Sequence, residues 1–279
     1  MKQTNEKKLA HIAAKGRLLG LDMVYDCSSG HLGGSFSAMD ILAVLYFETM
    51  NLPNPNDPDR DRFVLSKGHC TPALYPILAQ RGLFPEEELQ HFRKIDGHLS
   101  GHAEMHHVPG VDMSTGSLGQ GISAAVGMAL AGHMDQKDYR VYALLGDGEI
   151  EEGQVWEAAM SAAKYKLDHL CAVIDVNGLQ IDGKTSDVMP SEPLDKKFEA
   201  FGWHVLKVNG HDYEEIAAAF EQAKTQHDAP TVILAKTIKG KGVSFMENDP
   251  AWHGKAPNEA QYIKARAELV ATLNETEGL

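Results

Sequence analysis

The sequence has few cysteines, and those it has are not arranged in pairs. Three cysteines occur among 279 residues, and no C-x-x-C spacing joins any two of them. Disulfide frameworks and structural zinc sites need paired or closely spaced cysteines, so the pattern disfavours both. We therefore expect Cys27, Cys70 and Cys171 to be buried thiols.

Long apolar runs are also absent. Apolar residues make up 43% of the chain, but no stretch approaches the roughly 18 uninterrupted apolar residues of a membrane helix. Residues 1–17 are charged and polar, without the apolar core or cleavage site of a secretory signal. We expect a soluble protein that stays in the cytoplasm.

Positive charge is scarce relative to negative charge. The chain has 26 Lys and Arg against 39 Asp and Glu, a formal net charge of -13. Nucleic-acid binding depends on clustered Lys and Arg, so this balance disfavours it. An anionic ligand must instead be held by local groups such as backbone amides, histidines or a bound metal.

The second half of the chain alternates short apolar runs with helical segments. We expect strands at 141–145, 170–176, 205–208 and 231–235, and helices at 154–166 and 213–224. This alternation predicts an α/β fold with a mostly parallel sheet flanked by helices on both faces. We expect residues 1–279 to form one domain of this kind.

The first half and the C-terminus contain less regular patterns. Helical spacing predicts helices at 4–27 and 258–274. A third helix begins with Ser37 as a plausible N-cap. The stretch 96–115 is mostly irregular and rich in His and Gly, and long irregular loops in compact domains are usually functional.

The most informative segment is the Gly-Asp-Gly turn that follows the strand predicted at 141–145. Asp147 lies in this turn, and Asn177 follows the next predicted strand. Ligands bind at the carboxyl edge of open α/β sheets, so we expect both side chains at one site. A carboxylate, an amide oxygen and a nearby backbone carbonyl suit magnesium or calcium, with a diphosphate completing the shell.

A Gly-Asp-Gly turn followed about 30 residues later by Asn resembles the signature of thiamine diphosphate enzymes. The resemblance implies that Asp147, Asn177 and the carbonyl of Leu179 ligate Mg²⁺, Ca²⁺ or Mn²⁺, which anchors thiamine diphosphate. It also places Gly146 and Gly148 at the cofactor. The residue before the asparagine is often polar in these enzymes, whereas this chain has valine there.

Other segments resemble the first domain of transketolases, in the same order and over nearly the whole chain. They are Ser-Gly-His at 29–31, Ser-Lys-Gly-His at 66–69, Gly-His at 101–102, T-G-S-L-G-Q-G at 115–121 and H-G-K-A-P at 253–257. Each motif alone is weak, but together they are specific. The expected fold is therefore the thiamine diphosphate-binding fold, and residues 1–279 would be its diphosphate-binding (PP-type) domain.

The transketolase resemblance assigns roles to four histidines. It implies that His31, His102 and His253 are catalytic residues lining the sugar channel, and that His69 and His253 lie near the cofactor diphosphate. Imidazole can exchange protons with substrate oxygens near neutral pH. A single loop histidine is usually only solvated or hydrogen-bonded in place, so these roles depend on the resemblance.

The resemblance also implies that Gly116, Ser117 and Leu118 contact the cofactor, with Leu118 against its rings. Transketolases commonly have proline where Ser117 stands. Glu152 receives a supporting role near the cofactor, although helix-dipole complementarity explains it equally well, as it does Glu149. Asp182 and residues 239–242 resemble segments near the active-site mouth, or they are solvated loops.

In transketolases the glutamate that activates the cofactor lies in a second, pyrimidine-binding domain. We expect this chain to consist of the first domain alone, without that domain and the C-terminal domain. The resemblance therefore implies a transferase active only with a partner: the N-terminal subunit of a two-chain transketolase, in a heterotetramer with a C-terminal subunit. It would transfer a two-carbon ketol (glycolaldehyde) unit from a ketose to an aldose, as in pentose phosphate metabolism.

Three other functions stay open at this point. The chain could belong to a 2-oxo acid dehydrogenase, could be a deoxyxylulose-phosphate synthase-like protein, or could be a regulatory subunit without catalytic function. A nicotinamide dehydrogenase is disfavoured because G-S-L-G-Q-G at 116–121 lacks the dinucleotide spacing and follows a polar segment instead of a strand.

Overall fold

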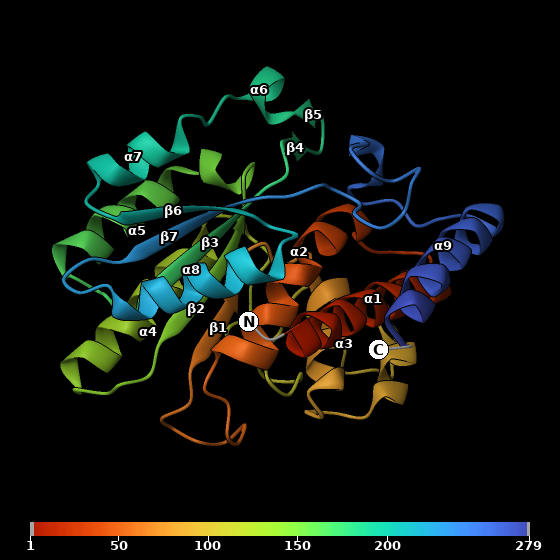
Figure 1. Ribbon diagram of the computed structural model, residues 1–279, viewed down its shortest axis with the longest axis horizontal. Helices are drawn as coiled ribbons and strands as arrows, with labels where there is room; N and C mark the ends of the chain where they lie inside the picture. Colours follow the sequence, from red (N-terminus) through yellow and green to blue (C-terminus); the bar gives the residue numbers. More distant parts are fainter. Residues whose placement is uncertain (1–2, 278–279) are drawn as a thin grey trace.

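The computed structural model describes residues 3–277 and centres on one five-stranded sheet (Figure 1). The strand order is β1-β2-β3-β7-β6, and every neighbouring pair is parallel. The strands are β1 (Arg62–Leu65), β2 (Val141–Gly146), β3 (Leu170–Val176), β6 (His204–Asn209) and β7 (Thr231–Lys236). The predicted parallel sheet is confirmed.

Helices cover both faces of the sheet, as predicted (Figure 1). One face carries α1 (Gln3–Asp26), α2 (Leu32–Val44), α3 (Thr71–Gln80) and α8 (Tyr213–Thr225), with α9 (Glu259–Glu277) packed on α1. The other face carries α4 (Gln120–Met134), α5 (Gly153–Lys164) and α7 (Leu194–Ala200). Short elements complete the fold: η1 (Leu45–Thr49), η2 (Glu86–His91), η3 (Glu149–Glu151), β4 (Leu179–Gln180), β5 (Gly183–Lys184), α6 (Thr185–Val188) and η4 (Pro250–Trp252).

The central strands β2, β3 and β7 are mostly apolar and almost completely buried, whereas the edge strand β6 is only partly buried. Leu144 and Val173 point into the core beneath α1, α2 and α3. Their neighbours Leu145 and Ile174 point into the core beneath α4 and α5. Successive side chains on a strand face opposite sides, so one apolar run supplies both cores and reads as continuous hydrophobicity.

Two predictions in the N-terminal half need correction. α2 begins at Leu32 and not at Ser37, which is buried inside the helix. Gly33 and Gly34 have low helix propensity and hid the true start, but a Cβ on Gly33 would come within 2.9 Å of the Trp252 carbonyl oxygen. Close packing therefore selects glycine there. Cys27 is half-buried, whereas the other two thiols are buried as predicted.

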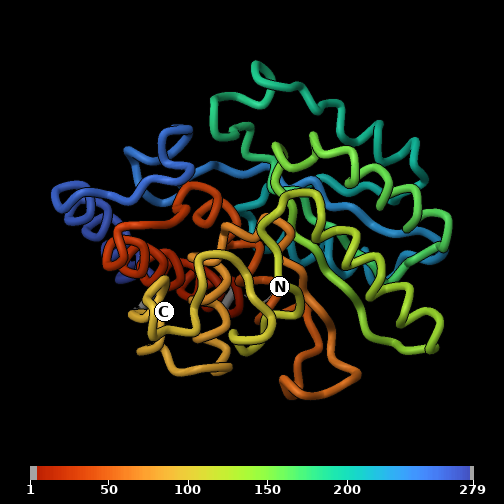
Figure 2. The backbone as a smooth tube through the Cα atoms, turned by 180° about the vertical axis from the view of Figure 1, so that it is seen from behind, coloured from red at the N-terminus to blue at the C-terminus, as the bar shows by residue number. Residues whose placement is uncertain are grey.

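The predicted irregular stretch is confirmed, because no strand or α-helix occurs between η2 and α4. Figure 2 shows this gold-to-yellow trace on the side of the molecule turned away from the viewer of Figure 1. None of the helices within residues 3–277 combines the length and apolarity needed to cross a membrane.

Candidate active site

The carboxyl ends of β2 and β3 bring Asp147 and Asn177 into one cavity. Gly146 pairs with Asp175 in the sheet, and the Asp147 backbone N–H donates to the Asp175 carbonyl at 3.2 Å. One carboxylate oxygen of Asp147 accepts the Gly178 N–H at 2.5 Å. Asp147, Asn177 and Leu179 all line the same cavity. The sequence pattern predicted this convergence, and sheet register produces it.

The Asp147 carboxylate is buried, with 3% of the residue exposed. Burial, reinforced by the negative charge of Asp175, raises the pKa of Asp147 to about 7. The Gly178 N–H and nearby lysines only partly oppose this rise. A buried carboxylate with such a pKa is stabilised in its charged form when a cation binds beside it.

The oxygen atoms around this carboxylate suit a hard divalent cation. Asn177 donates its amide N–H to Asp175 at 3.1 Å, and its Oδ1 accepts the Leu179 N–H at 3.1 Å. Asn177 Oδ1 uses one lone pair for this hydrogen bond, and its second lone pair could face a metal. Within residues 3–277 no cluster of three His, Cys, Asp or Glu side chains could hold a metal. A mixed set of carboxylate, amide and carbonyl oxygens is the arrangement that fits Mg²⁺.

A buried ion pair lies directly beneath the cavity. Lys67 Nζ contacts Asp175 Oδ2, and both side chains are almost completely buried. Asp175 also accepts hydrogen bonds from Ser37 and Thr237. Burial opposes both charges, yet the partner raises the pKa of Lys67 and lowers the pKa of Asp175. Our sequence reasoning missed this pair, although an aspartate inside an apolar strand is a usable signal.

Lys239 adds a second ammonium group to the cavity. Its Nζ donates to the Leu179 carbonyl at 3.2 Å and to Nδ1 of His253 at 3.1 Å. Burial and the positive charge of Lys67 lower the pKa of Lys239. Two lysines beside a small, partly enclosed cavity favour an anionic ligand such as a diphosphate. The sequence had placed this segment only near the mouth of the site.

The four predicted histidines gather at one end of the cavity. The His31 ring centroid lies 5.0 Å from His69, 6.1 Å from His102 and 5.5 Å from His253. His69 and His253 lie 5.2 Å apart and line the cavity with Asp147. Nδ1 of His31 is buried without a hydrogen-bond partner in the described part of the chain.

All four imidazoles are held in their neutral form. Burial, followed by nearby positive charges, lowers the pKa of His31 to about 4 and that of His253 to about 3. The pKa of His69 is far below its ordinary value and that of His102 is lowered, both chiefly through burial. Neutral rings can both donate and accept hydrogen bonds, which suits contacts to sugar hydroxyls and carbonyls.

The glycine-rich loop before α4 closes another side of the site. Gly116 has a φ of +150°, and a Cβ there would come within 3.0 Å of the His102 ring. Leu118 is half-buried and lines the cavity, whereas Ser117 is exposed. Gly119 is left-handed and begins α4. The strand that a dinucleotide loop would require is absent before it, as the polar segment in the sequence predicted.

Three predicted cofactor residues do not line the cavity: Gly116, Ser117 and Glu152. Glu152 is exposed, and it occupies the N-cap position of α5. Glu149 is buried and lines the cavity instead. Its carboxylate accepts hydrogen bonds from Ser66, from the Gly119 N–H at 2.9 Å and from the Gly146 N–H at 3.0 Å. Glu149 therefore ties three loops of the site together, a role that a short acidic run in the sequence does not reveal.

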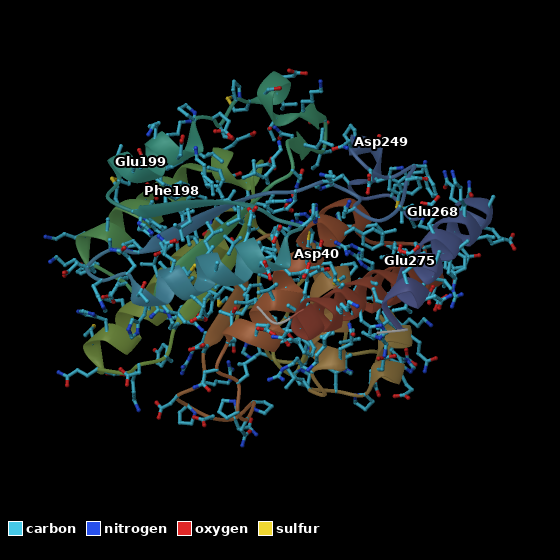
Figure 3. All side chains as sticks on the ribbon, viewed as in Figure 1. Asp40, Phe198, Glu199, Asp249, Glu268 and Glu275 are labelled. Carbon is cyan, nitrogen blue, oxygen red and sulfur yellow. The ribbon has the colours of Figure 1, made fainter. Side chains whose placement is uncertain are left out.

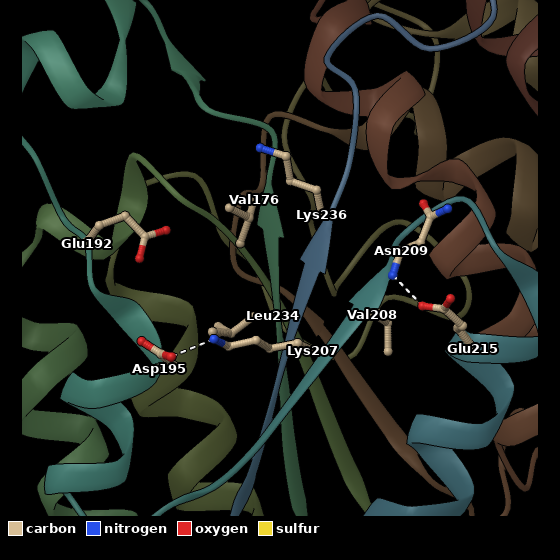
Figure 4. Close-up of a pocket in the computed structure, with 9 residues that line it drawn as sticks. All are labelled: Val176, Glu192, Asp195, Lys207, Val208, Asn209, Glu215, Leu234 and Lys236. Atoms are coloured by element: carbon tan, nitrogen blue, oxygen red, sulfur yellow. Dashed lines mark hydrogen bonds and ion pairs between the residues drawn. The ribbon is translucent and has the colours of Figure 1, made fainter.

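A second, more open pocket lies beside the carboxyl ends of β3, β7 and β6 (Figure 4). Two of its charged side chains pair with each other, since Lys207 contacts Asp195 at 2.5 Å, and a third, Glu215, accepts the Asn209 N–H at 2.7 Å. None of the predicted site residues lines it. The cavity at Asp147 is therefore the candidate active site.

Fold and cavity together define an α/β protein whose strand-end cavity combines carboxylate, amide and carbonyl oxygens with two buried lysines. The family model described as "Transketolase, thiamine diphosphate binding domain" matches residues 8–275. The 6-deoxy-6-sulfo-D-fructose transketolase subunit SqwG of Clostridium sp. (strain MSTE9) is 49% identical over 263 residues, covering 94% of this chain and 96% of that protein. One subunit of the apulose-4-phosphate transketolase of Phocaeicola vulgatus is 42% identical over 265 residues, covering 94% of each chain.

A solved structure agrees. The crystal structure of transketolase from Campylobacter jejuni matches with a TM-score of 0.87 and 35% identity, over 96% of this chain. The match spans only 45% of that longer chain. This chain belongs to the transketolase thiamine diphosphate-binding domain family. The resemblance inferred from the sequence motifs is confirmed at the level of the family.

Proposed function

We propose that this chain is the N-terminal, cofactor-binding subunit of a two-chain transketolase. The observation that carries the proposal is the shared cavity of Asp147, Asn177 and Leu179, in a chain that aligns along nearly its whole length with two transketolase subunits. Residues 1–279 would form one diphosphate-binding domain, and two copies would assemble with two copies of a C-terminal subunit.

In this proposal the strand end of the cavity binds the cofactor. Asp147, the amide oxygen of Asn177 and the carbonyl of Leu179 would hold Mg²⁺, and Lys239 would face the diphosphate. Lys239 is nearly fully buried and its Nζ already contacts the Leu179 carbonyl. The metal ion and the Lys239 ammonium would be two positive charges in a site with little water, and such charges bind phosphate oxygens strongly. Leu118 would pack against the cofactor rings.

The histidine end would bind the sugar. Thiamine diphosphate, when bound, supplies a nucleophilic carbon and an electron sink for breaking a bond next to the ketose carbonyl. His31, His102 and His253 would orient the ketose and exchange protons with its oxygens. Their lowered pKa values keep the rings neutral at pH 7, so each can donate through one nitrogen and accept through the other.

The proposed donors are ketoses with an anionic head group. The names of the two transketolase subunits refer to a sulfonated ketose and to a ketose phosphate. In this chain the two buried lysines of the cavity lie at the cofactor end: Lys67 contacts Asp175, and Lys239 contacts the carbonyl of the proposed metal ligand Leu179. Recognition of the head group is therefore assigned to the partner subunit.

The test is reconstitution of the two-chain enzyme. The chain would be co-expressed with the product of its neighbouring open reading frame and supplied with Mg²⁺ and thiamine diphosphate. Fructose 6-phosphate and 6-deoxy-6-sulfofructose would be offered with an aldose acceptor. We expect ketol transfer only when both chains are present. Full turnover by this chain alone would contradict the two-chain proposal, and pyruvate oxidation with a dye acceptor would favour a 2-oxo acid dehydrogenase.

A further inference from the structure

His211 lies between two groups that fix both of its ring nitrogens. The Ile238 backbone N–H donates to Nε2 at 2.9 Å, and Nδ1 lies 2.7 Å from Oδ2 of Asp40. A backbone N–H can only donate, so Nε2 must be the unprotonated acceptor. The single proton of the neutral ring is then on Nδ1 and is donated to Asp40. Both the tautomer and the orientation of the ring are thereby determined.

Asp40 is itself held firmly near the centre of the molecule (Figure 3). Arg17 on α1 donates to both of its oxygens, at 2.9 and 2.6 Å, and the Tyr213 hydroxyl donates at 2.8 Å. Burial alone would raise the pKa of Asp40, but Arg17 and His211 lower that pKa overall. The carboxylate therefore stays charged and makes strong, charge-assisted hydrogen bonds.

The hydrogen-bonded network of Arg17, Asp40, Tyr213 and His211 contacts the active site through the segment that follows β7. The Thr237 N–H donates to the Val176 carbonyl at 3.1 Å, and the Gly240 N–H donates to the Gly33 carbonyl at 2.9 Å. Between them, Ile238 has its N–H on the His211 ring. A partly buried N–H that loses its acceptor costs free energy, so we expect removal of the ring to displace this segment. The residue that follows Ile238 is Lys239.

We propose that His211 is a positioning residue: it holds the Ile238 amide so that Lys239 reaches the cavity of Asp147. Asp40, which is held by Arg17 and Tyr213, fixes the His211 ring. The ring in turn fixes the backbone N–H of Ile238. The inference builds on the proposed function, in which Lys239 meets the cofactor diphosphate. His211 does not line the cavity, and its ring nitrogens contact Asp40 and the Ile238 N–H, so its proposed effect on the cavity passes through Lys239.

The test is a double-mutant cycle on cofactor affinity. Calorimetric titration of thiamine diphosphate with Mg²⁺ into the full chain with its partner subunit would compare the wild type with His211→Phe, Lys239→Ala and the double variant. We expect His211→Phe to weaken binding about 10-fold, as outer-shell substitutions do. In the Lys239→Ala background, His211→Phe should weaken cofactor binding by less than about 2-fold more, because the side chain through which His211 acts has been removed.

Two further variants separate positioning from general structure. His211→Gln keeps an acceptor for Ile238 and a donor for Asp40, so we expect near wild-type affinity. His227→Phe alters an exposed histidine whose ring lies near Asp168 and not in this network, and affinity should not change. Hydrogen exchange of the Ile238 amide should accelerate in His211→Phe and not in His211→Gln. Should the Phe variant fail to fold, His211→Asn takes its place in the cycle.

The outcomes are distinguishable. If His211→Phe still weakened cofactor binding 10-fold in the Lys239→Ala background, the positioning role would be overturned. Unchanged hydrogen exchange of the Ile238 amide in His211→Phe would also overturn it. A wild-type protein without magnesium-dependent cofactor binding would instead refute the proposed function on which this inference rests.

Discussion

The two ends of the cavity are built in different ways. At the strand end, Asp147 directly follows β2 and Asp175 lies on the neighbouring parallel strand β3, so sheet register alone fixes their separation. At the other end, His31, His69 and His102 come from loops far apart in the sequence and meet only in the folded chain. The first arrangement follows from local patterns, whereas the second requires tertiary convergence.

The two ends also differ in charge. The strand end keeps buried charges, because Lys67 and Asp175 stabilise each other. The histidine end avoids charge, since burial lowers the pKa of each imidazole. An end with buried charged groups suits a metal and a diphosphate, and a neutral end suits sugar hydroxyls. In the proposed function, this difference separates cofactor binding from substrate handling.

The largest expected effect is at the strand end. Asp147→Ala removes the buried carboxylate proposed to bind the metal, so affinity for thiamine diphosphate with Mg²⁺ should fall on the order of 100-fold or more. Calorimetry on the two-chain complex measures it. Asp187→Ala, an exposed aspartate on α6, is the matched control and should leave affinity unchanged. If Asp147→Ala kept near wild-type affinity for the cofactor, the strand end would not be the cofactor end of the cavity.

The second effect is at the histidine end and should change turnover instead of binding. His102→Ala should lower kcat about 100-fold, the scale of a lost proton-transfer group. Cofactor affinity should stay nearly unchanged, because His102 does not line the cavity at Asp147. Steady-state kinetics at saturating cofactor, together with calorimetry, check both. Equal losses in kcat and affinity would show that the two ends do not have separate roles.

The third effect concerns stability at the strand end. Asp175→Asn leaves the Lys67 ammonium buried without its counter-charge, which should cost about 3–5 kcal/mol of unfolding free energy. Urea unfolding monitored by circular dichroism measures the loss. The exposed pair between Lys166 and Asp228, 3.0 Å apart, provides the control, because Asp228→Asn should have a far smaller effect. A similar loss in both variants would contradict the account.

The smallest effect is a pH dependence at the histidine end. His31 and His253 have folded pKa values of about 4 and 3, below the ordinary value of 6.5. The unfolded chain therefore binds more protons below pH 6.5, and these groups lose stabilising effect as pH falls toward 4. The drop in unfolding free energy between pH 7 and pH 5 should be smaller in a His31→Asn, His253→Asn variant.

Asp147 acts in the opposite direction, because its raised pKa favours the folded state as pH falls below 7. The difference between wild type and the double-histidine variant, and not the wild-type curve alone, therefore isolates the imidazoles. Equal pH responses in the two proteins would show that the rings are not held neutral by the fold.

The sequence predicted most of the strand end because local patterns encode it. The strand expected at 170–176 coincides with β3, since an apolar run buried on both faces has clear limits. The pair of Lys67 and Asp175 was missed because 108 residues separate its members. Glu152 was predicted at the cofactor instead of Glu149 because the sequence does not distinguish neighbouring glutamates in a short run. Only the backbone conformation shows that Glu149 is the buried one.

The histidine end was foreseen only through its resemblance to transketolases. Nothing in the spacing of His31, His69, His102 and His253 requires their rings to meet, and they do so only because four separate segments end at one place. The network through His211 left no sequence signal, since its contacts to Asp40 and Ile238 depend on the packing of α2 against the turn before α8.

The central claim is that two adjacent strand ends create a metal-dependent diphosphate site. The most direct measurement is calorimetric titration of thiamine diphosphate into the two-chain complex, first with Mg²⁺ and then after EDTA treatment. The account predicts one site per chain, with affinity lower by on the order of 100-fold without metal, and the same weakening in Asn177→Leu with Mg²⁺ present. Equal affinity with and without the metal would contradict it.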